Sequence, residues 1–178
     1  TFQVSDLSER HSFADYQANR ALTCIVMMLV GILYCQLRGY DPQMFTLCMG
    51  MFAYRAVDGL ADVYEGRLQQ MDKLYLAGIS QAIRSAAVII AYCALILITR
   101  SIGAAGVAMA VASVASFVLL TLPLTYFETP KSAKLSIASV KDLFVQCFPL
   151  FVALFLYNLI DNMPKFAMEG ALSYDNQL

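Results

Sequence analysis

Long apolar runs separated by short polar segments dominate this sequence. Four of them occupy residues 21–37, 82–99, 104–127 and 143–163, so each is 17 to 24 residues long. A helix needs about 20 apolar residues to cross a bilayer. Each run therefore predicts a membrane-spanning helix.

A fifth predicted span, residues 43–66, begins as an apolar segment but becomes polar without a Pro or turn cluster. We expect its helix to continue to about Leu76. Its polar residues are spaced alternately by three and four, which at about 100° per residue places them in one narrow sector of a helix. A charged stripe on a membrane helix must face a cavity or a partner helix, so we expect the chemistry of this chain beside it. The stripe consists of Arg55, Asp58, Asp62, Glu65 and Gln69.

Local signals predict where two helices begin. Ser12 followed by Asp15 resembles a capping box, so we expect a helix from about Phe13. Asp41 can cap the following helix, and Pro42 suits its first position. In the span 104–127, a row of small residues every four positions predicts a packing face; the row is Ala104, Ala108, Ala112 and Ser116.

The last span carries a second polar stripe. Pro149 lies inside the span and is expected to kink it, and Pro164 is expected to interrupt the helix beside the stripe, which makes both prolines candidate hinges. The stripe consists of Asn158, Asp161, Asn162 and Lys165.

The composition changes the picture from a helical protein to a membrane protein. Of the 178 residues, 60% are hydrophobic and only 14% charged, whereas soluble domains are about half apolar and a quarter charged. No basic tract or Gly-rich phosphate loop favours nucleic-acid binding. We predict an all-α integral membrane protein with five transmembrane helices. Because the chain opens with Thr1 and stops without a turn or cap, we expect it to be a fragment.

The potential metal ligands do not form a pattern. The five cysteines are scattered without a C-x-x-C pair, so we interpret them as small buried hydrophobic residues rather than as a disulfide or metal site. His11 is the only histidine and lies in a polar segment, where we expect it to be solvated. We predict no metal site.

The basic residues predict an orientation. If residues 1–20 are cytoplasmic and the spans alternate, eight Lys and Arg side chains lie on the cytoplasmic side and three outside, in agreement with the positive-inside rule. The eight are Arg10, Arg20, Arg67, Lys73, Arg84, Lys131, Lys134 and Lys141, and the three are Arg38, Arg100 and Lys165.

The two stripes have a structural and a functional interpretation. In the first, the charges pair with one another or with other helices and hold the bundle together. In the second, they line a cavity that opens to water on one side at a time. Arg55 would then bind a phosphate or carboxylate through two hydrogen bonds. The acids would balance it, bind a coupling cation or contact sugar hydroxyls.

Three segments together resemble a known family. They are the run YRAVDGLADVYEGRLQQMDKLYLAGIS, the F-x-x-Y-x-x-x-R pattern of Phe13, Tyr16 and Arg20, and the ending NLIDNMPKFAMEG. In order and spacing they resemble the polysaccharide-biosynthesis flippases, the O-antigen and capsule flippases of the multidrug/oligosaccharidyl-lipid/polysaccharide transporter superfamily. The resemblance covers essentially the whole chain.

The resemblance implies an architecture. Family members have two six-helix lobes around a central cavity, and the five spans here resemble the third to seventh. Residues 1–127 would be part of the N-terminal lobe, 128–142 the cytoplasmic linker between lobes, and 143–178 the start of the C-terminal lobe.

The resemblance also implies a function. The family moves undecaprenyl-pyrophosphate-linked oligosaccharide from the inner to the outer leaflet of the cytoplasmic membrane by alternating access. Implied partners are this lipid-linked oligosaccharide, membrane lipids and the polysaccharide polymerase machinery, with no nucleic acid and no cofactor beyond a coupling cation or proton. Arg55 and Lys165 match cationic cavity residues, and Arg20 and Arg84 lie near the cytoplasmic entrance. The implied polar lining is Asp58, Asp62, Glu65, Asn158, Asp161 and Asn162.

Two alternatives stay open. A cation-coupled drug exporter of the same superfamily would use buried acids such as Asp58 and Asp62. A membrane enzyme is suggested by the string DGLA at Asp58, which invites comparison with CDP-alcohol phosphotransferases. The carboxylate cluster that would hold metal in those enzymes is incomplete here, so we do not expect an enzyme.

Overall fold

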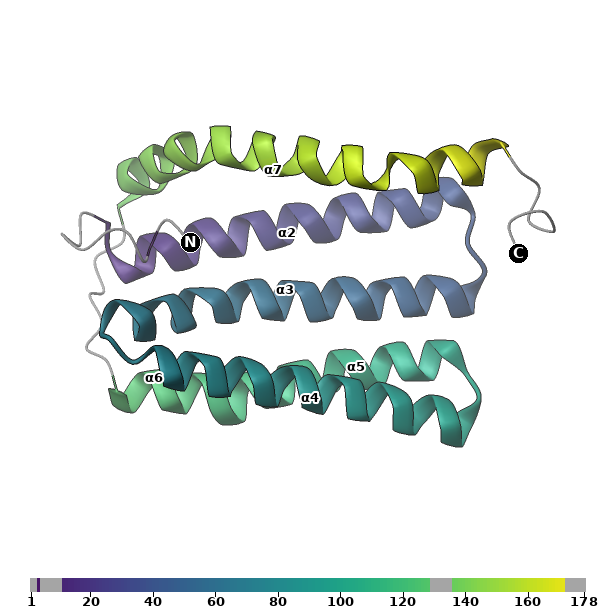
Figure 1. Ribbon diagram of the computed structural model, residues 1–178, viewed down its shortest axis with the longest axis horizontal. Coiled ribbons are helices and arrows are strands. Elements are labelled where there is room, and N and C mark those ends of the chain that lie inside the picture. Colours follow the sequence, from purple (N-terminus) through teal and green to yellow (C-terminus); the bar gives the residue numbers. More distant parts are fainter. Residues whose placement is uncertain (1–2, 4–10, 129–135, 172–178) are drawn as a thin grey trace. The chain divides into compact units, whose positions relative to one another are not determined.

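The computed structural model of this chain describes residue 3 and residues 11–128 and 136–171 (Figure 1). Every regular element in these ranges is helical, which confirms the predicted all-α class. The chain separates into two compact units, Thr1–Val140 and Lys141–Leu178. Each unit is described on its own below.

The first unit is built around a central helix. Its elements are α2 (Phe13–Arg38), α3 (Pro42–Gln70), α4 (Leu74–Thr99), α5 (Ile102–Ser116), a π-helical turn η1 (Phe117–Thr121) and α6 (Leu122–Glu128). The turns after α2 and after α4 lie at one end of this unit and the turn after α3 at the other, so its helices alternate in direction (Figure 1). The helix α3 packs against α2, α4 and α5. The charged stripe of α3 therefore has neighbours on several sides.

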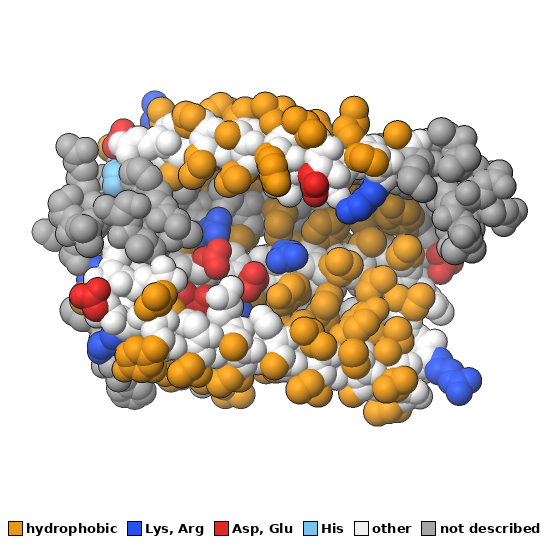
Figure 2. Space-filling view, viewed as in Figure 1, with side chains coloured by type: hydrophobic (Ala, Val, Ile, Leu, Met, Phe, Trp, Pro, Cys, Tyr) orange, Lys and Arg blue, Asp and Glu red, His pale blue; other side chains and the backbone are white. Residues whose placement is uncertain are grey.

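Four helical stretches are long and apolar enough to cross a membrane: Phe13–Arg38, Leu74–Thr99, Ile102–Tyr126 and Ile137–Lys165. With 29 residues, α3 is also long enough, at roughly 43 Å. It is not among the four, since its polar stripe makes it less apolar. Hydrophobic side chains cover the visible surface of α4 (Figure 2), as expected for a helix in contact with lipid.

The predicted helix starts are confirmed. Ser12 and Asp15 form a reciprocal capping box at the start of α2. The side chain of Asp41 accepts the backbone N–H of Gln43, and Pro42 occupies the first turn of α3. Each of these starts depends on three or four neighbouring residues, which is why the sequence alone predicts them.

The predicted end of α3 is wrong. The helix does not continue to Leu76 but ends at Gln70, and α4 already begins at Leu74. Asp72 has φ 58° in the intervening turn, a left-handed conformation that Asp tolerates better than most residues. Because this turn contains no Gly or Pro, the sequence gives little warning of it.

The second unit consists of most of α7 (Ile137–Ala171), which contains Pro149 and Pro164. The helix continues through both prolines, so the predicted interruption at Pro164 is wrong. Membrane helices tolerate proline where other groups satisfy the freed carbonyl. In the predicted linker 128–142, residues 129–135 lie outside the described residues, and the part from Ile137 onward is already helical.

The closest helix contact joins α3 and α5. A Cβ atom added at Gly50 would lie 2.3 Å from the carbonyl oxygen of Gly106, so the two backbones touch. Small residues permit such an approach in membrane helices. A small-residue face on this span was predicted, but the wrong row was chosen: the buried small residues are Gly103, Ala105, Gly106 and Ser113.

The start of α2 also holds the start of α7, within the first unit. One carboxylate oxygen of Asp15 accepts the N–H of Ser12 at 3.1 Å, and the other accepts the N–H of Ser136 at 2.9 Å. His11 is buried, with Nδ1 2.8 Å from the hydroxyl of Ser139. The expectation that His11 is solvated is therefore wrong. Its partner Ser139 lies 128 residues away along the chain, so the local sequence could not reveal this contact.

Candidate functional site

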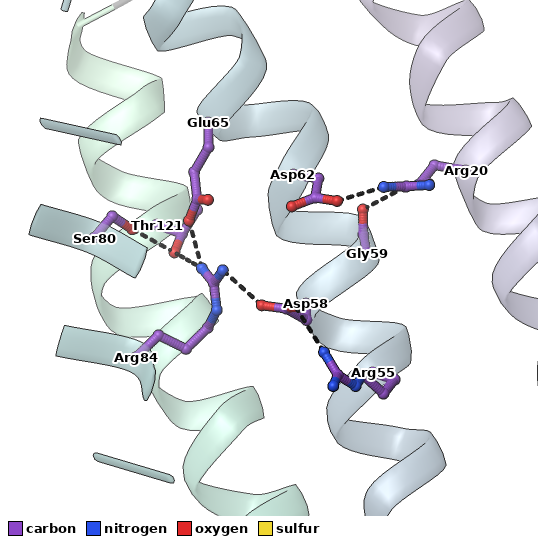
Figure 3. Close-up of polar contacts among 9 residues, drawn as sticks. All are labelled: Arg20, Arg55, Asp58, Gly59, Asp62, Glu65, Ser80, Arg84 and Thr121. Atoms are coloured by element: carbon purple, nitrogen blue, oxygen red, sulfur yellow. Dashed lines mark hydrogen bonds and ion pairs between the residues drawn. The ribbon is translucent and has the colours of Figure 1, made fainter. Parts of the chain in front are cut away.

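The polar stripe of α3 and its partners form one cluster in the first unit. We define the α3 cluster as the stripe residues Arg55, Asp58, Asp62 and Glu65 with their partners Arg20 from α2, Arg84 and Ser80 from α4, and Thr121 from η1 (Figure 3). Charged side chains gather over the central and C-terminal part of α3 (Figure 2).

Arg84 is the buried centre of this cluster. Its side chain is 0% exposed, Nη2 donates to Oδ1 of Asp58 at 2.9 Å, and Nη1 donates to Oε1 of Glu65 at 2.5 Å. The two acids are seven residues apart, so a single guanidinium spans two turns of α3. Within the described residues, the buried Nε of Arg84 has no hydrogen-bond partner. The structure encloses Arg84 between helices, and its expected position near a cytoplasmic entrance stays a prediction.

The π-helical turn brings a hydroxyl to Arg84. Thr121 Oγ1 accepts from Nη1 of Arg84 at 3.4 Å and lies 3.0 Å from Ser80 Oγ. In an uninterrupted α-helix, Leu120 would share the face of Ser113, and Thr121 would be turned away by about 80°. The extra residue of η1 changes this register, and Ser113 and Thr121 are both fully buried. Such π-turns are often found at functional sites.

Arg20 joins α2 to α3. Its Nε donates to the carbonyl oxygen of Gly59 at 2.9 Å, and its Nη2 pairs with the carboxylate of Asp62. The two side chains are 39% and 34% exposed. This pair and the Arg84 pairs therefore occupy all three acids of the stripe.

Arg55 differs from the other two arginines. Its side chain is 67% exposed, and Nη1 lies 3.9 Å from Oδ2 of Asp58, at the outer limit of an ion pair. Its guanidinium carbon lies 5.5 Å from the centre of the Tyr54 ring. Arg55 is thus the arginine of the α3 cluster with the most exposed side chain.

The charges of the α3 cluster balance. Three arginines face three carboxylates, and the most buried members are paired at short distance. Charges inside a bilayer are costly unless they are paired or hydrated. The paired members satisfy this condition, whereas Arg55 requires water or a further anion.

The second predicted stripe lies on α7, in the second unit. The side-chain amides of Asn158 and Asn162 donate to the carbonyls of Leu154 and Asn158, each at 2.8 Å. Lys165 Nζ donates to Oδ1 of Asn162 at 2.9 Å. These bonds stay within one helix, and Asp161 and Lys165 are exposed.

The comparison with known proteins identifies the family. Residues 9–178 match the sequence profile of a family described as polysaccharide biosynthesis protein. The match covers nearly the entire chain. The chain belongs to the polysaccharide biosynthesis protein family. Neither the comparison with curated proteins nor that with solved structures gives a match.

As a polysaccharide biosynthesis protein with four apolar helices of membrane-spanning length, the chain is a multi-pass membrane protein. The profile match confirms the family that the sequence resembles. The described part of this polysaccharide biosynthesis protein holds no group of three or more His, Cys, Asp or Glu side chains arranged for a metal ion. All five cysteines are free, and only Cys35 is buried. Cys93 is exposed and the other three are partly exposed, so the expectation that all five are buried is wrong.

Two members of the α3 cluster were missed by the sequence analysis of this polysaccharide biosynthesis protein. Ser80 and Thr121 are common hydroxyl residues in apolar runs, and their role depends on the π-turn. Arg84 was noticed as a charge but was not paired with Asp58 and Glu65. A signal was available, since a single arginine in an apolar span requires an acidic partner.

Proposed function

We propose that this polysaccharide biosynthesis protein carries undecaprenyl-pyrophosphate-linked oligosaccharide across the cytoplasmic membrane by alternating access. The observation that carries the proposal is the exposure of Arg55 on a helix whose three acids are engaged by arginines. An anionic substrate needs an available cation, and Arg55 provides one.

The position of Arg55 suits a phosphate. Counted from Pro42, it lies roughly 20 Å along α3, near the depth of a bilayer midplane. An exposed arginine at that depth must face a water-filled cavity or a partner. Its guanidinium can hold two phosphate oxygens at once and keeps its charge at all physiological pH values.

The neighbouring carboxylates suit the sugar. Asp58 and Asp62 keep 23% and 34% of their side chains exposed although both are paired. Carboxylate oxygens have several acceptor positions, so these acids can accept hydroxyl groups of an oligosaccharide while they stay bound to arginine. Within the second unit, taken on its own, Asn158, Asp161, Asn162 and Lys165 are proposed as polar substrate contacts and Pro149 and Pro164 as hinges.

A cation-coupled drug exporter is the second candidate. Such an exporter would bind a proton or metal cation at acids such as Asp58 and Asp62. Both already face arginines, which lowers their attraction for another cation. The pairing therefore favours the flippase. We propose transport rather than an enzymatic reaction because each acid of the α3 stripe is engaged by an arginine.

A complementation experiment separates the candidates. The complete gene is introduced into cells that lack a polysaccharide flippase and, in parallel, into cells that lack drug efflux pumps. Restored surface polymer without increased drug resistance is the expected result. Drug resistance without polymer would overturn the flippase and support the exporter.

A further inference from the structure

The carboxylate of Asp58 lies between two arginines that it holds unequally. Oδ1 receives the buried Nη2 of Arg84 at 2.9 Å, whereas Oδ2 is 3.9 Å from Nη1 of the exposed Arg55. Asp58 and Arg55 are three residues apart on α3, a spacing at which oppositely charged side chains readily pair. Another interaction of the Asp58 carboxylate must therefore prevent a close ion pair with Arg55.

The surroundings of Arg84 explain this imbalance. Arg84 is fixed on the other side by Glu65 at 2.5 Å and by the hydroxyl of Thr121. A guanidinium that is fully buried and held at several points loses little entropy when it binds one more acceptor, whereas an exposed side chain such as Arg55 loses more. Arg84 is therefore the stronger partner for Asp58.

We infer that Arg84 is a positioning residue for the anion site: by holding Asp58, it keeps the guanidinium of Arg55 available for the phosphate groups of the substrate. Without Arg84, Asp58 turns toward Arg55 and competes with the incoming anion. This inference rests on the proposed role of Arg55 in the transport of a pyrophosphate-linked substrate.

The inference predicts a specific pattern of suppression. Arg84→Gln should weaken anion binding because Asp58 then occupies Arg55. Adding Asp58→Asn should restore binding because the competing charge is gone. Adding Glu65→Gln instead should not restore it, although Glu65 also contacts Arg84 and is the more buried acid. Glu65→Gln is thus the matched control: like Asp58→Asn, it removes a carboxylate that lost its partner Arg84, but it does not remove the carboxylate next to Arg55.

The test measures binding of inorganic pyrophosphate to the complete, purified gene product in detergent by titration calorimetry. If Asp58 occupies Arg55 about nine-tenths of the time in Arg84→Gln, affinity falls about tenfold. The variant Arg84→Gln/Asp58→Asn should return to within about twofold of the wild type, while Arg84→Gln/Glu65→Gln stays weak. Unchanged binding in Arg84→Gln, or equal recovery in both double variants, would overturn the inference.

Two further variants keep the outcomes distinct. Arg55→Ala tests the proposed site itself. If this variant binds pyrophosphate as tightly as the wild type does, both the proposed anion site and the inference about Arg84 are wrong. If Arg55→Ala abolishes pyrophosphate binding while Arg84→Gln does not weaken it, only the inference about Arg84 is wrong. Should Arg84→Gln fail to fold, Asp58→Asn alone decides, because the inference requires binding at least as tight as in the wild type and weaker binding would overturn it.

Discussion

The three arginines of the α3 cluster carry the same charge but differ in burial. The side chains of Arg84, Arg20 and Arg55 are 0%, 39% and 67% exposed. Burial determines what each can do. Arg84 connects three elements, Arg20 connects two, and Arg55 remains open to an anion. In a membrane, a buried ion pair contributes little net stability, but the loss of one partner leaves an uncompensated charge.

Replacement of Arg84 should therefore be costly for folding as well as for binding. For Arg84→Met we expect a loss of about 3–5 kcal/mol, because Glu65 would remain buried without its cation. Thermal or denaturant unfolding of the complete protein in detergent measures this loss. The control Arg38→Met changes an exposed arginine at the end of α2, and a similar loss for both variants would contradict the role of Arg84.

The hydroxyl of Thr121 contributes on a smaller scale. Thr121→Val keeps the shape of the side chain but removes the acceptor for Arg84 and the partner of Ser80. We expect a loss of about 1–3 kcal/mol, since a buried polar group is left with one partner fewer. Thr23→Val, at an exposed hydroxyl that bonds within its own helix, should cost much less. Equal losses would show that η1 does not serve the cluster.

At the scale of elements, the backbone contact between α3 and α5 determines how close the two helices lie. Gly50 and Gly106 leave no room for a side chain between them. Gly50 and Arg55 are five residues apart, which places them about 140° apart around α3. The contact with α5 and the exposed Arg55 therefore lie on different sides of the helix.

Gly50→Ala should separate α3 from α5. Its Cβ atom would meet the carbonyl oxygen of Gly106 at 2.3 Å, and we expect a loss of about 1–3 kcal/mol from this overpacking. Gly78→Ala on α4 is the matched control, because a Cβ atom there has nothing within 4 Å. That variant should be neutral or stabilise by about 0.5–1 kcal/mol, since Ala favours a helix over Gly. If Gly50→Ala unfolds at the same temperature as Gly78→Ala, the contact is not tight.

The elements differ in how far the sequence predicts them. The starts of α2 and α3 follow from caps made by adjacent residues, and the apolar runs follow from the thickness of a bilayer. The turn at Asp72, the π-turn η1 and the continuation of α7 through Pro164 have no such signal in the adjacent residues. The stripe on α3 could be predicted, and the single arginine in the span 82–99 indicated an acidic partner. Which acids Arg84 binds, and that Thr121 joins them, follows only from how α3, α4 and η1 pack together.

At the scale of the whole molecule, the described helices fit a multi-pass membrane bundle of the polysaccharide biosynthesis protein family. In the first unit, the turns at Arg38 and Arg100 lie at one end and the turn at Asp72 at the other (Figure 1). With Arg84 enclosed between helices, one of the eight cytoplasmic charges used to predict the orientation is removed, leaving seven against three outside. The predicted orientation is therefore unchanged.

Reporter fusions test this orientation. Alkaline phosphatase, which is active only outside the cytoplasm, should be active when fused after Arg38 or Arg100 and inactive when fused after Asp72. A cytoplasmic fluorescent reporter should give the opposite pattern. Phosphatase activity at Asp72 would reverse the orientation and place the Asp62 end of the α3 stripe on the outer side.

The measurement that tests the central claim most directly is the amount of surface polymer in flippase-deficient cells that carry Arg55 variants of the complete gene. We predict that Arg55→Lys retains part of the transport and that Arg55→Ala retains little. Arg38→Ala, at an exposed arginine away from the α3 cluster, should match the wild type. Membrane levels of all variants are compared in the same cells. Equal polymer in the wild type, Arg55→Lys and Arg55→Ala would contradict the assignment of Arg55 as the phosphate contact.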